Sequence, residues 1–238
     1  MSNLYLVFFA CLLGYLTYYY LSNFRTKLHK DIYYAFYQIF PQKQPHFTIE
    51  QADQAGQLSP LSLANQWIYI GVSIVLCSII QTLTKDLTLT CFYMSYLVLL
   101  FIIGKLDWHY QLIEPALCQL LLLILSGASY FRLISNSLED VVESAVISFV
   151  IFYLVYHISK LCYKKEVFGQ GDYWLISALS AGLSWRDIPL MISLACLLAL
   201  FYALIYNRLI AHRKISLVPF APFLCTANLV TLFIKMLI

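Results

Sequence analysis

Long, nearly uncharged apolar runs recur along the chain, and they limit its fold more than any other feature. Apolar residues make up 61% of the 238 residues, and only 11% are charged. A soluble domain of this size has about a quarter of its residues charged. Continuous runs of this length suit membrane helices, whereas a membrane barrel alternates apolar and polar residues in short strands. We therefore expect an all-α polytopic membrane protein.

About eight apolar runs are predicted to enter or cross the membrane as helices, with one longer cytosolic loop after the first. The predicted runs are Leu4–Leu21, Trp67–Leu83, Leu87–Gly104, Ile113–Phe131, Val141–Lys160, Tyr173–Leu183, Ile188–Tyr206 and Val218–Ile238. The sixth run is short for a full crossing. The predicted domains are a first transmembrane helix over residues 1–22, a cytosolic loop over 23–66 and a membrane-embedded core over 67–238.

The charged residues predict the orientation. No basic residue precedes the first run and no cleavage site is clear, so we expect an uncleaved first span with its N-terminus outside. Alternating spans then place 11 of the 15 Lys and Arg residues inside and 4 outside. This agrees with the enrichment of basic residues on the cytoplasmic side. Both termini are therefore predicted to lie outside.

Asp172 lies in the sequence Gly169-Gln170-Gly171-Asp172, directly before an apolar run. The two glycines allow close backbone approach and unusual dihedral angles. One interpretation makes Asp172 the N-cap of a helix that begins near Tyr173. The other makes it a functional carboxylate, because ionisable groups at the edge of the hydrocarbon region are costly.

Asp107 lies between the third and fourth runs, in a predicted turn that also contains Lys105. A solvated aspartate paired with lysine is one interpretation. The orientation suggests another, because Asp107 and Asp172 both fall at predicted cytoplasmic ends of spans, 65 residues apart. Two adjacent carboxyl groups do not readily ionise together, so they share a proton and are able to activate water.

These residues resemble a known family. Gly-x-Gly-Asp at the start of a membrane helix, with a partner aspartate about 65 residues upstream, is similar to the type IV prepilin peptidases of the GxGD group of aspartyl proteases. Three further stretches agree in part, and they are Asp107–Pro115, Leu175–Trp185 and Lys214–Leu224. The resemblance covers about Leu87 to Leu224.

The resemblance implies a site and a substrate. It implies that Asp107 and Asp172 are the catalytic pair, and that prepilins or pseudopilins are cut after a glycine at the cytoplasmic face. It also implies supporting roles for Gly169, Gly171, Pro219 and Pro222. The two prolines equally suit the start of a helix. The substrate-binding residues are not predicted.

Two departures from the family bear on cofactors. Many members carry two Cys-x-x-Cys pairs in the first cytosolic loop, but residues 22–66 contain no cysteine, so no zinc site of that kind is expected. Many members also methylate the new N-terminus with S-adenosylmethionine. That activity is linked with the first loop, which differs here, so we do not carry it over and expect no cofactor. Glu114 either replaces an acid of the family pattern or begins a helix.

We therefore expect an aspartic prepilin peptidase of the bacterial inner membrane, with its active site facing the cytoplasm. The expected partners are prepilin or pseudopilin helices and membrane lipid, with no nucleic acid. The main alternative is a degenerate relative that binds these substrates without cutting them. A proton-relaying transporter is a third hypothesis, but its acids would be distributed across the bilayer rather than at its edges.

Overall fold

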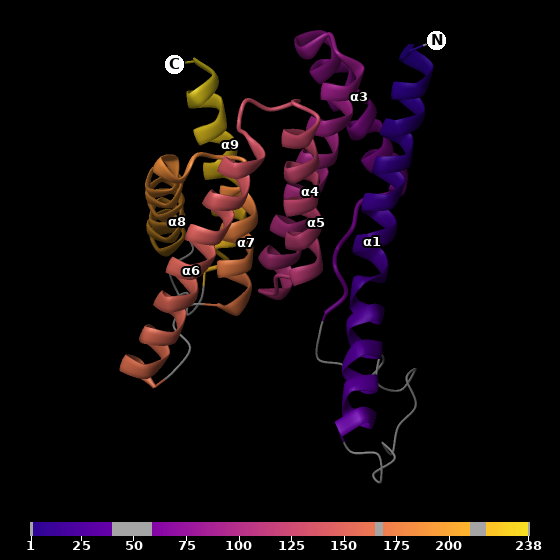
Figure 1. Cartoon of the computed structure of the whole chain (residues 1–238). Helices are drawn as coiled ribbons and strands as arrows, with labels where there is room; N and C mark the ends of the chain where they lie inside the picture. Colours follow the sequence, from indigo (N-terminus) through magenta and orange to yellow (C-terminus); the bar gives the residue numbers. More distant parts are fainter. Residues whose placement is uncertain (1, 40–58, 165–168, 210–217, 238) are drawn as a thin grey trace. The chain divides into compact units, whose positions relative to one another are not determined.

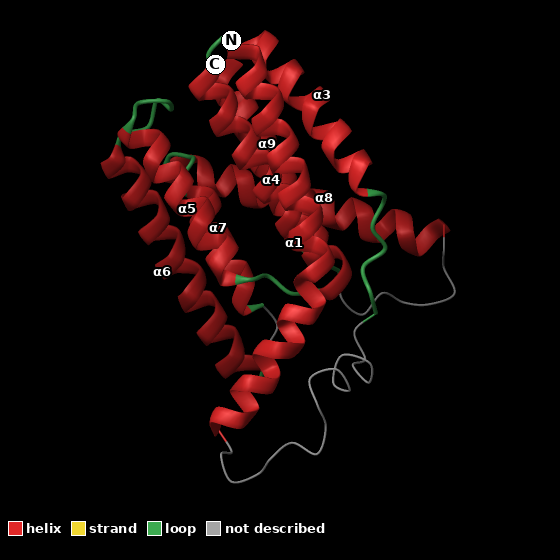
Figure 2. Ribbon diagram, turned by 90° about the vertical axis from the view of Figure 1, so that its right-hand side faces the viewer, coloured by secondary structure: helices red, strands yellow, loops and turns green. Residues whose placement is uncertain are grey.

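The computed structural model describes residues 2–39, 59–164, 169–209 and 218–237, and within these ranges all regular structure is helical. Figure 2 shows the helices joined by loops and turns. The elements are α1 Ser2–Ile39, α3 Gln66–Thr84, α4 Leu87–Tyr110, α5 Pro115–Tyr130, α6 Leu138–Tyr163, α7 Gln170–Ser180, the 3-10 turn η1 Trp185–Asp187, α8 Ile188–Leu209 and α9 Ala221–Leu237.

Most of these helices suit a membrane. Helices α1, α3, α4, α6 and α8 lie in the 5 segments that are long and apolar enough to cross a bilayer, and α5 and α9 are shorter apolar helices. Helix α7 has 11 residues and corresponds to the short sixth run. Large apolar side chains such as Phe8, Leu83 and Leu161 are exposed, as expected for helices that face lipid. The predicted fold class is confirmed.

Several helices extend beyond the predicted runs. Helix α1 continues to Ile39, past the end predicted at residue 22, and α4 continues to Tyr110, so that it includes Asp107. A helix does not have to end with its apolar run, since polar residues with good helix propensity extend it. Much of the predicted cytosolic loop, residues 40–58, lies outside the described residues. The division into domains stays a prediction.

The chain divides into two compact units, Met1–Leu87 and Thr88–Ile238. In the first unit, α1 packs against α3 (Figure 1). Gly14 lies at this contact, where an added Cβ would be 2.8 Å from the Ile70 Cα and 2.9 Å from the Tyr69 carbonyl oxygen. Ala10 is fully buried. Small residues therefore let the two helix backbones approach closely.

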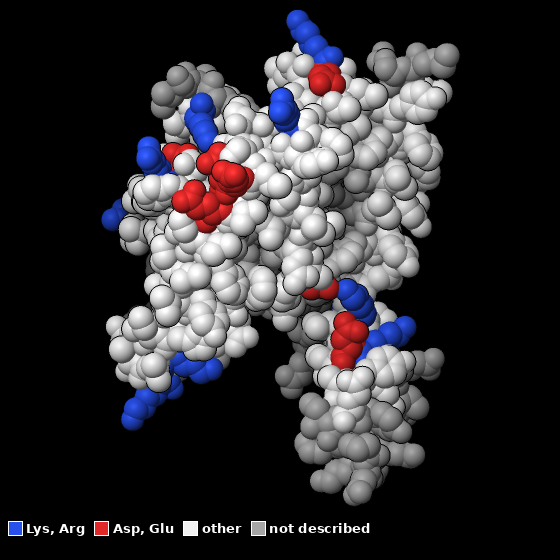
Figure 3. Space-filling view, in the orientation of Figure 1, with Lys and Arg blue, Asp and Glu red and all other residues white. Residues whose placement is uncertain are grey.

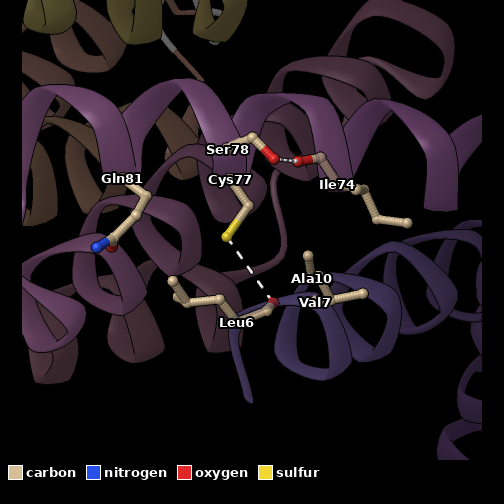
Figure 4. A pocket seen from close by; sticks show the side chains of 7 residues that line it. All are labelled: Leu6, Val7, Ala10, Ile74, Cys77, Ser78 and Gln81. Atoms are coloured by element: carbon tan, nitrogen blue, oxygen red, sulfur yellow. Dashed lines mark hydrogen bonds between the residues drawn. The ribbon is translucent and has the colours of Figure 1, made fainter. Parts of the chain in front are cut away.

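A cavity of about 230 Å³ lies between α1 and α3. Figure 4 shows Leu6, Val7 and Ala10 of α1 facing α3 across it. The thiol of Cys77 donates a hydrogen bond to the Leu6 carbonyl oxygen at 3.9 Å. The walls are mainly apolar, with Ser78 and Gln81 as the polar side chains.

Helix α7 is the most enclosed helix of the second unit. It packs against α5, α6 and α9, and its residues from Leu175 to Ser180 are all buried. The Ser177 hydroxyl donates to the Ala145 carbonyl oxygen of α6 at 2.8 Å. Small side chains in this stretch permit close helix packing, and the hydroxyl satisfies a buried polar group.

A buried polar network joins four helices of the second unit. The Tyr96 hydroxyl of α4 donates to the Asn228 side-chain oxygen of α9. The Asn228 amide nitrogen donates to the Leu179 carbonyl oxygen of α7 at 3.1 Å and to the Met191 sulfur of α8 at 3.4 Å. Hydrogen bonds with defined geometry fix the relative register of helices more strictly than apolar contacts do.

Candidate active site

Asp107 lies in the last turn of α4 and is only 5% exposed. Its Oδ2 accepts a hydrogen bond of 2.9 Å from the backbone N–H of Ala221. Ala221 is the first residue of α9, where backbone N–H groups have no partner within their own helix. The predicted solvated turn around Asp107 is therefore wrong. The helix continues through this position, and α9 covers the carboxyl group.

Asp172 is the third residue of α7, and Gly169 occupies the N-cap position. The N-cap interpretation of Asp172 is therefore wrong, although the residue still lies in the first turn. Its carboxyl group turns back toward the N-cap, because a Cβ added to Gly169 would lie 2.9 Å from the Asp172 Oδ2. The positive end of the helix dipole stabilises a negatively charged side chain at this position.

The two aspartates lie close enough for their charges to interact. The pKa of Asp172 is raised to about 7, chiefly by burial and then by the negative charge of Asp107, while a hydrogen bond from the Gly169 backbone opposes both effects. The structure therefore brings the two predicted residues together from α4 and α7. Two carboxyl groups that repel each other in this way do not readily ionise together.

Gly171 is required by packing rather than by an unusual backbone angle. A Cβ added there would lie 2.5 Å from the Ile113 Cβ, and no glycine in the described residues has positive φ. Real Cβ atoms do not approach so closely. The segment after α4 therefore lies directly against the start of α7, next to Asp172.

Further residues surround the pair. The Gln170 side chain donates to the Tyr156 hydroxyl of α6 at 2.8 Å, which ties the start of α7 to the last turns of α6. The Trp108 ring, next to Asp107, contacts the rings of Tyr202 and Phe223. Neither these contacts nor the Ala221 amide could be predicted from the sequence. A backbone donor has no side-chain signal, and the ring contacts join residues distant in sequence.

The remaining predicted residues lie at or just before the starts of helices. Pro222 is the second residue of α9, and its Cα would lie 3.7 Å from a Cβ added to Gly104. Pro219 precedes the helix. Glu114 is the N-cap residue of α5 and Pro115 follows it, which supports the interpretation of Glu114 as a helix-start residue.

Basic and acidic side chains gather at opposite ends of α6. Figure 3 shows acidic groups with basic groups beside them over its N-terminal end, which holds Glu139, Asp140 and Glu143, and only basic groups toward its C-terminal end, which holds Lys160 and Lys164. The bond from Gln170 to Tyr156 places the start of α7 at the basic end. The aspartate pair therefore shares this end of the second unit.

Comparisons with known proteins agree on one family. Residues 94–204, which include both aspartates, match the model of the type IV leader peptidase family. The chain is 34% identical over 230 residues to a prepilin leader peptidase/N-methyltransferase of Haemophilus influenzae, and the alignment covers 94% of each protein. No solved structure matches the chain.

More distant relatives carry the same name. The chain is 33% identical over 116 residues to a prepilin leader peptidase/N-methyltransferase of Aeromonas hydrophila, over 48% of this chain and 40% of that protein. It is 29% identical over 138 residues to the protein of that name from Escherichia coli, over 58% of this chain and 60% of that protein.

Proposed function

The chain belongs to the type IV leader peptidase family, and we propose that it removes the leader peptide from type IV prepilins or pseudopilins by a two-aspartate mechanism. The relatives carry the name of that activity. One observation supports the catalytic type above all others. Asp107 and Asp172 interact electrostatically although they come from different helices, and the pKa of Asp172 is raised to about 7.

A carboxyl pair with one proton suits peptide hydrolysis. The ionised carboxylate takes a proton from water as the water oxygen attacks the scissile carbonyl carbon. The protonated carboxyl group donates a hydrogen bond to the carbonyl oxygen, where negative charge develops. Because Asp107 is only 5% exposed and lies against the start of α9, little bulk water reaches its carboxyl group.

The proposed site faces the cytoplasm at the surface of the bacterial inner membrane. The basic end of α6 supports this side, since Lys and Arg are enriched in cytoplasmic segments. A substrate whose apolar helix lies in the membrane would then present the peptide bond before that helix to the pair. Prepilins and pseudopilins are substrates of this kind, and membrane lipid surrounds both proteins.

We propose no cofactor for the cleavage. Within the described ranges, no group of three or more His, Cys, Asp or Glu side chains could hold a metal ion. S-adenosylmethionine carries a sulfonium cation and a ribose diol, which acidic side chains bind well. The cavity between α1 and α3 has no acidic residue in its lining and is smaller than typical ligand pockets. This cavity does not fit the cofactor, so we assign it no methylation step.

Co-expression with a panel of prepilins and pseudopilins tests the function. Leader removal is scored by gel shift, and mass spectrometry locates the cut and detects any added methyl group. Asp107→Ala and Asp172→Ala are each expected to abolish cleavage while the protein still inserts. Glu139→Gln is the control, because Glu139 is an exposed acid at the opposite end of α6. Cleavage that survives either alanine variant would remove that residue from the mechanism.

The alternative of a degenerate binder predicts a different result. An inserted, folded protein would then retain prepilins in a pull-down experiment, yet leave every leader intact. The raised pKa of Asp172 favours the peptidase, because binding alone does not need a coupled carboxyl pair.

A further inference from the structure

We propose that the backbone amide of Ala221 holds Asp107 as the ionised member of the pair, so that Asp107 acts as the base and Asp172 as the acid. This assignment rests on the proposed peptidase function. It adds a positioning group, the first N–H of α9, and gives each carboxyl group a separate role.

The first observation is the hydrogen bond itself. The Ala221 N–H donates to the Asp107 Oδ2 at 2.9 Å, and both residues are buried. A backbone donor stabilises the charged form of a carboxyl group and not the neutral form. Because water is excluded from Ala221, the bond does not compete with solvent. The N–H of Phe220 also interacts with this carboxyl group.

The second observation is the weaker support of Asp172. Its carboxyl group interacts with one backbone N–H, that of Gly169, and it lies over the first turn of its own 11-residue helix. Asp107 has two backbone donors at the start of a 17-residue helix. Since repulsion permits one charge at neutral pH, the better supported group carries it.

The other titratable side chains that interact with the pair do not change which aspartate carries the charge. Cys225 of α9 interacts with Asp107, and Cys118 of α5 interacts with Asp172. Both cysteines are buried among apolar residues, where a thiol stays neutral. Among these interacting side chains, the only charge that acts on each aspartate is therefore that of the other aspartate.

The proposed roles give a balanced reaction. Asp107 takes one proton from water, the water oxygen bonds to the carbonyl carbon, and Asp172 gives its proton to the carbonyl oxygen. In the second step Asp107 gives its proton to the leaving nitrogen, the carbon–nitrogen bond breaks, and Asp172 takes back a proton from the hydroxyl group. One water is consumed, and the pair returns to its starting charge.

An amide-to-ester replacement at position 221 tests the proposal. Lactic acid in place of Ala221 removes the N–H and preserves the side chain. The matched control is the same replacement at Ala227, which is also fully buried and lies in the same helix. The measurement is the pH profile of kcat/KM for prepilin cleavage by the full chain in detergent.

The ester at 221 is expected to move the acidic limb of that profile upward by about one pH unit or more, because a hydrogen bond to the ionised base is lost. The ester at 227 should lower stability without moving the limb. An equal loss of activity at every pH, with the limb unmoved, would show that the Ala221 amide serves packing only.

An infrared titration separates this proposal from the proposed function, because it does not need cleavage. At about pH 6 the protonated carboxyl band should disappear in Asp172→Asn and remain in Asp107→Asn. The reverse pattern would overturn the assignment even if cleavage is established. If the expected infrared pattern is seen in a protein that cleaves no prepilin, the assignment of the charge to Asp107 stands and the proposed peptidase function is rejected.

Discussion

At the scale of single residues, Asp172 is the group whose charge changes near neutral pH. Its pKa rises from the ordinary 3.8 to about 7, first through burial and then through the negative charge of Asp107. Between these two values the folded protein binds more protons than the unfolded chain. The free energy of unfolding is therefore expected to fall as pH rises from about 4 to about 7.

Asp172→Asn should remove this dependence. The amide stays neutral at every pH, and its oxygen still accepts a hydrogen bond from the Gly169 backbone. We expect a higher thermal midpoint than wild type at about pH 8, and a smaller difference at about pH 5, where Asp172 is protonated in wild type. Thermal unfolding in detergent at the two pH values measures this. Glu139→Gln should show no such pattern, and an equal gain at both pH values would contradict the prediction.

The sequence predicted the two aspartates but not their surroundings. Each aspartate alone also had a structural interpretation, and the two were identified by their shared predicted side of the membrane and by the resemblance of the surrounding sequence to the family. The Ala221 amide was not identifiable, since every residue except proline carries an N–H. The contact of Gly171 with Ile113 was also hidden, because a glycine motif does not tell whether a turn or a close approach requires it.

At the scale of helices, the position of α7 depends on Gly171. Gly171→Ala would place a Cβ 2.5 Å from the Ile113 Cβ, so the start of α7 must shift and Asp172 with it. A shift of about 1 Å in a catalytic group costs roughly 100-fold in rate. We expect a loss of that order in cleavage, with the protein still inserted.

Gly127→Ala is the matched control for this substitution. Gly127 lies in α5, and an added Cβ meets nothing within 4 Å. Alanine there should keep full cleavage and stabilise the helix by about 1 kcal/mol. Similar cleavage by the Gly171→Ala and Gly127→Ala variants would show that the contact with Ile113 does not position Asp172.

The network around Asn228 should set the register of α4, α7 and α9. Asn228→Leu leaves the Tyr96 hydroxyl and the Leu179 carbonyl oxygen without these bonds in a buried site. A buried polar group without its partner costs about 1–3 kcal/mol, whereas replacing both partners is nearly neutral. We therefore expect Tyr96→Phe to recover part of the stability lost in Asn228→Leu. A double-mutant cycle of unfolding free energies measures this, and simple additivity would contradict it.

Helix ends were less predictable than helices. The apolar runs predicted each helix, because a segment that crosses a bilayer must be long and apolar. The ends of α1 and α4 were missed because backbone hydrogen bonding continues into polar sequence, and in α4 it continues through Gly104 to Tyr110. The start of α9 was displaced from Val218 to Ala221 because Pro219 and Pro222 favour a first turn there.

At the scale of the whole molecule, the charge distribution predicts which end of the second unit faces the cytoplasm. The last turns of α6 carry Lys160 and an exposed Cys162, whereas Glu139 and Ser135 lie near its other end. Moving basic residues across a membrane is unfavourable during insertion. The end with the aspartate pair should therefore be cytoplasmic.

Thiol labelling of spheroplasts tests this orientation. One variant keeps Cys162 and replaces the other six cysteines with alanine, and a second adds Ser135→Cys to a cysteine-free chain. A membrane-impermeant maleimide applied to spheroplasts should label the cysteine at 135, and should label Cys162 only after the membrane is opened. Both side chains are exposed in the structure, so lack of labelling reports the side of the membrane rather than burial. Labelling of Cys162 from outside would reverse the topology and place the aspartate pair on the wrong side for a substrate presented from the cytoplasm.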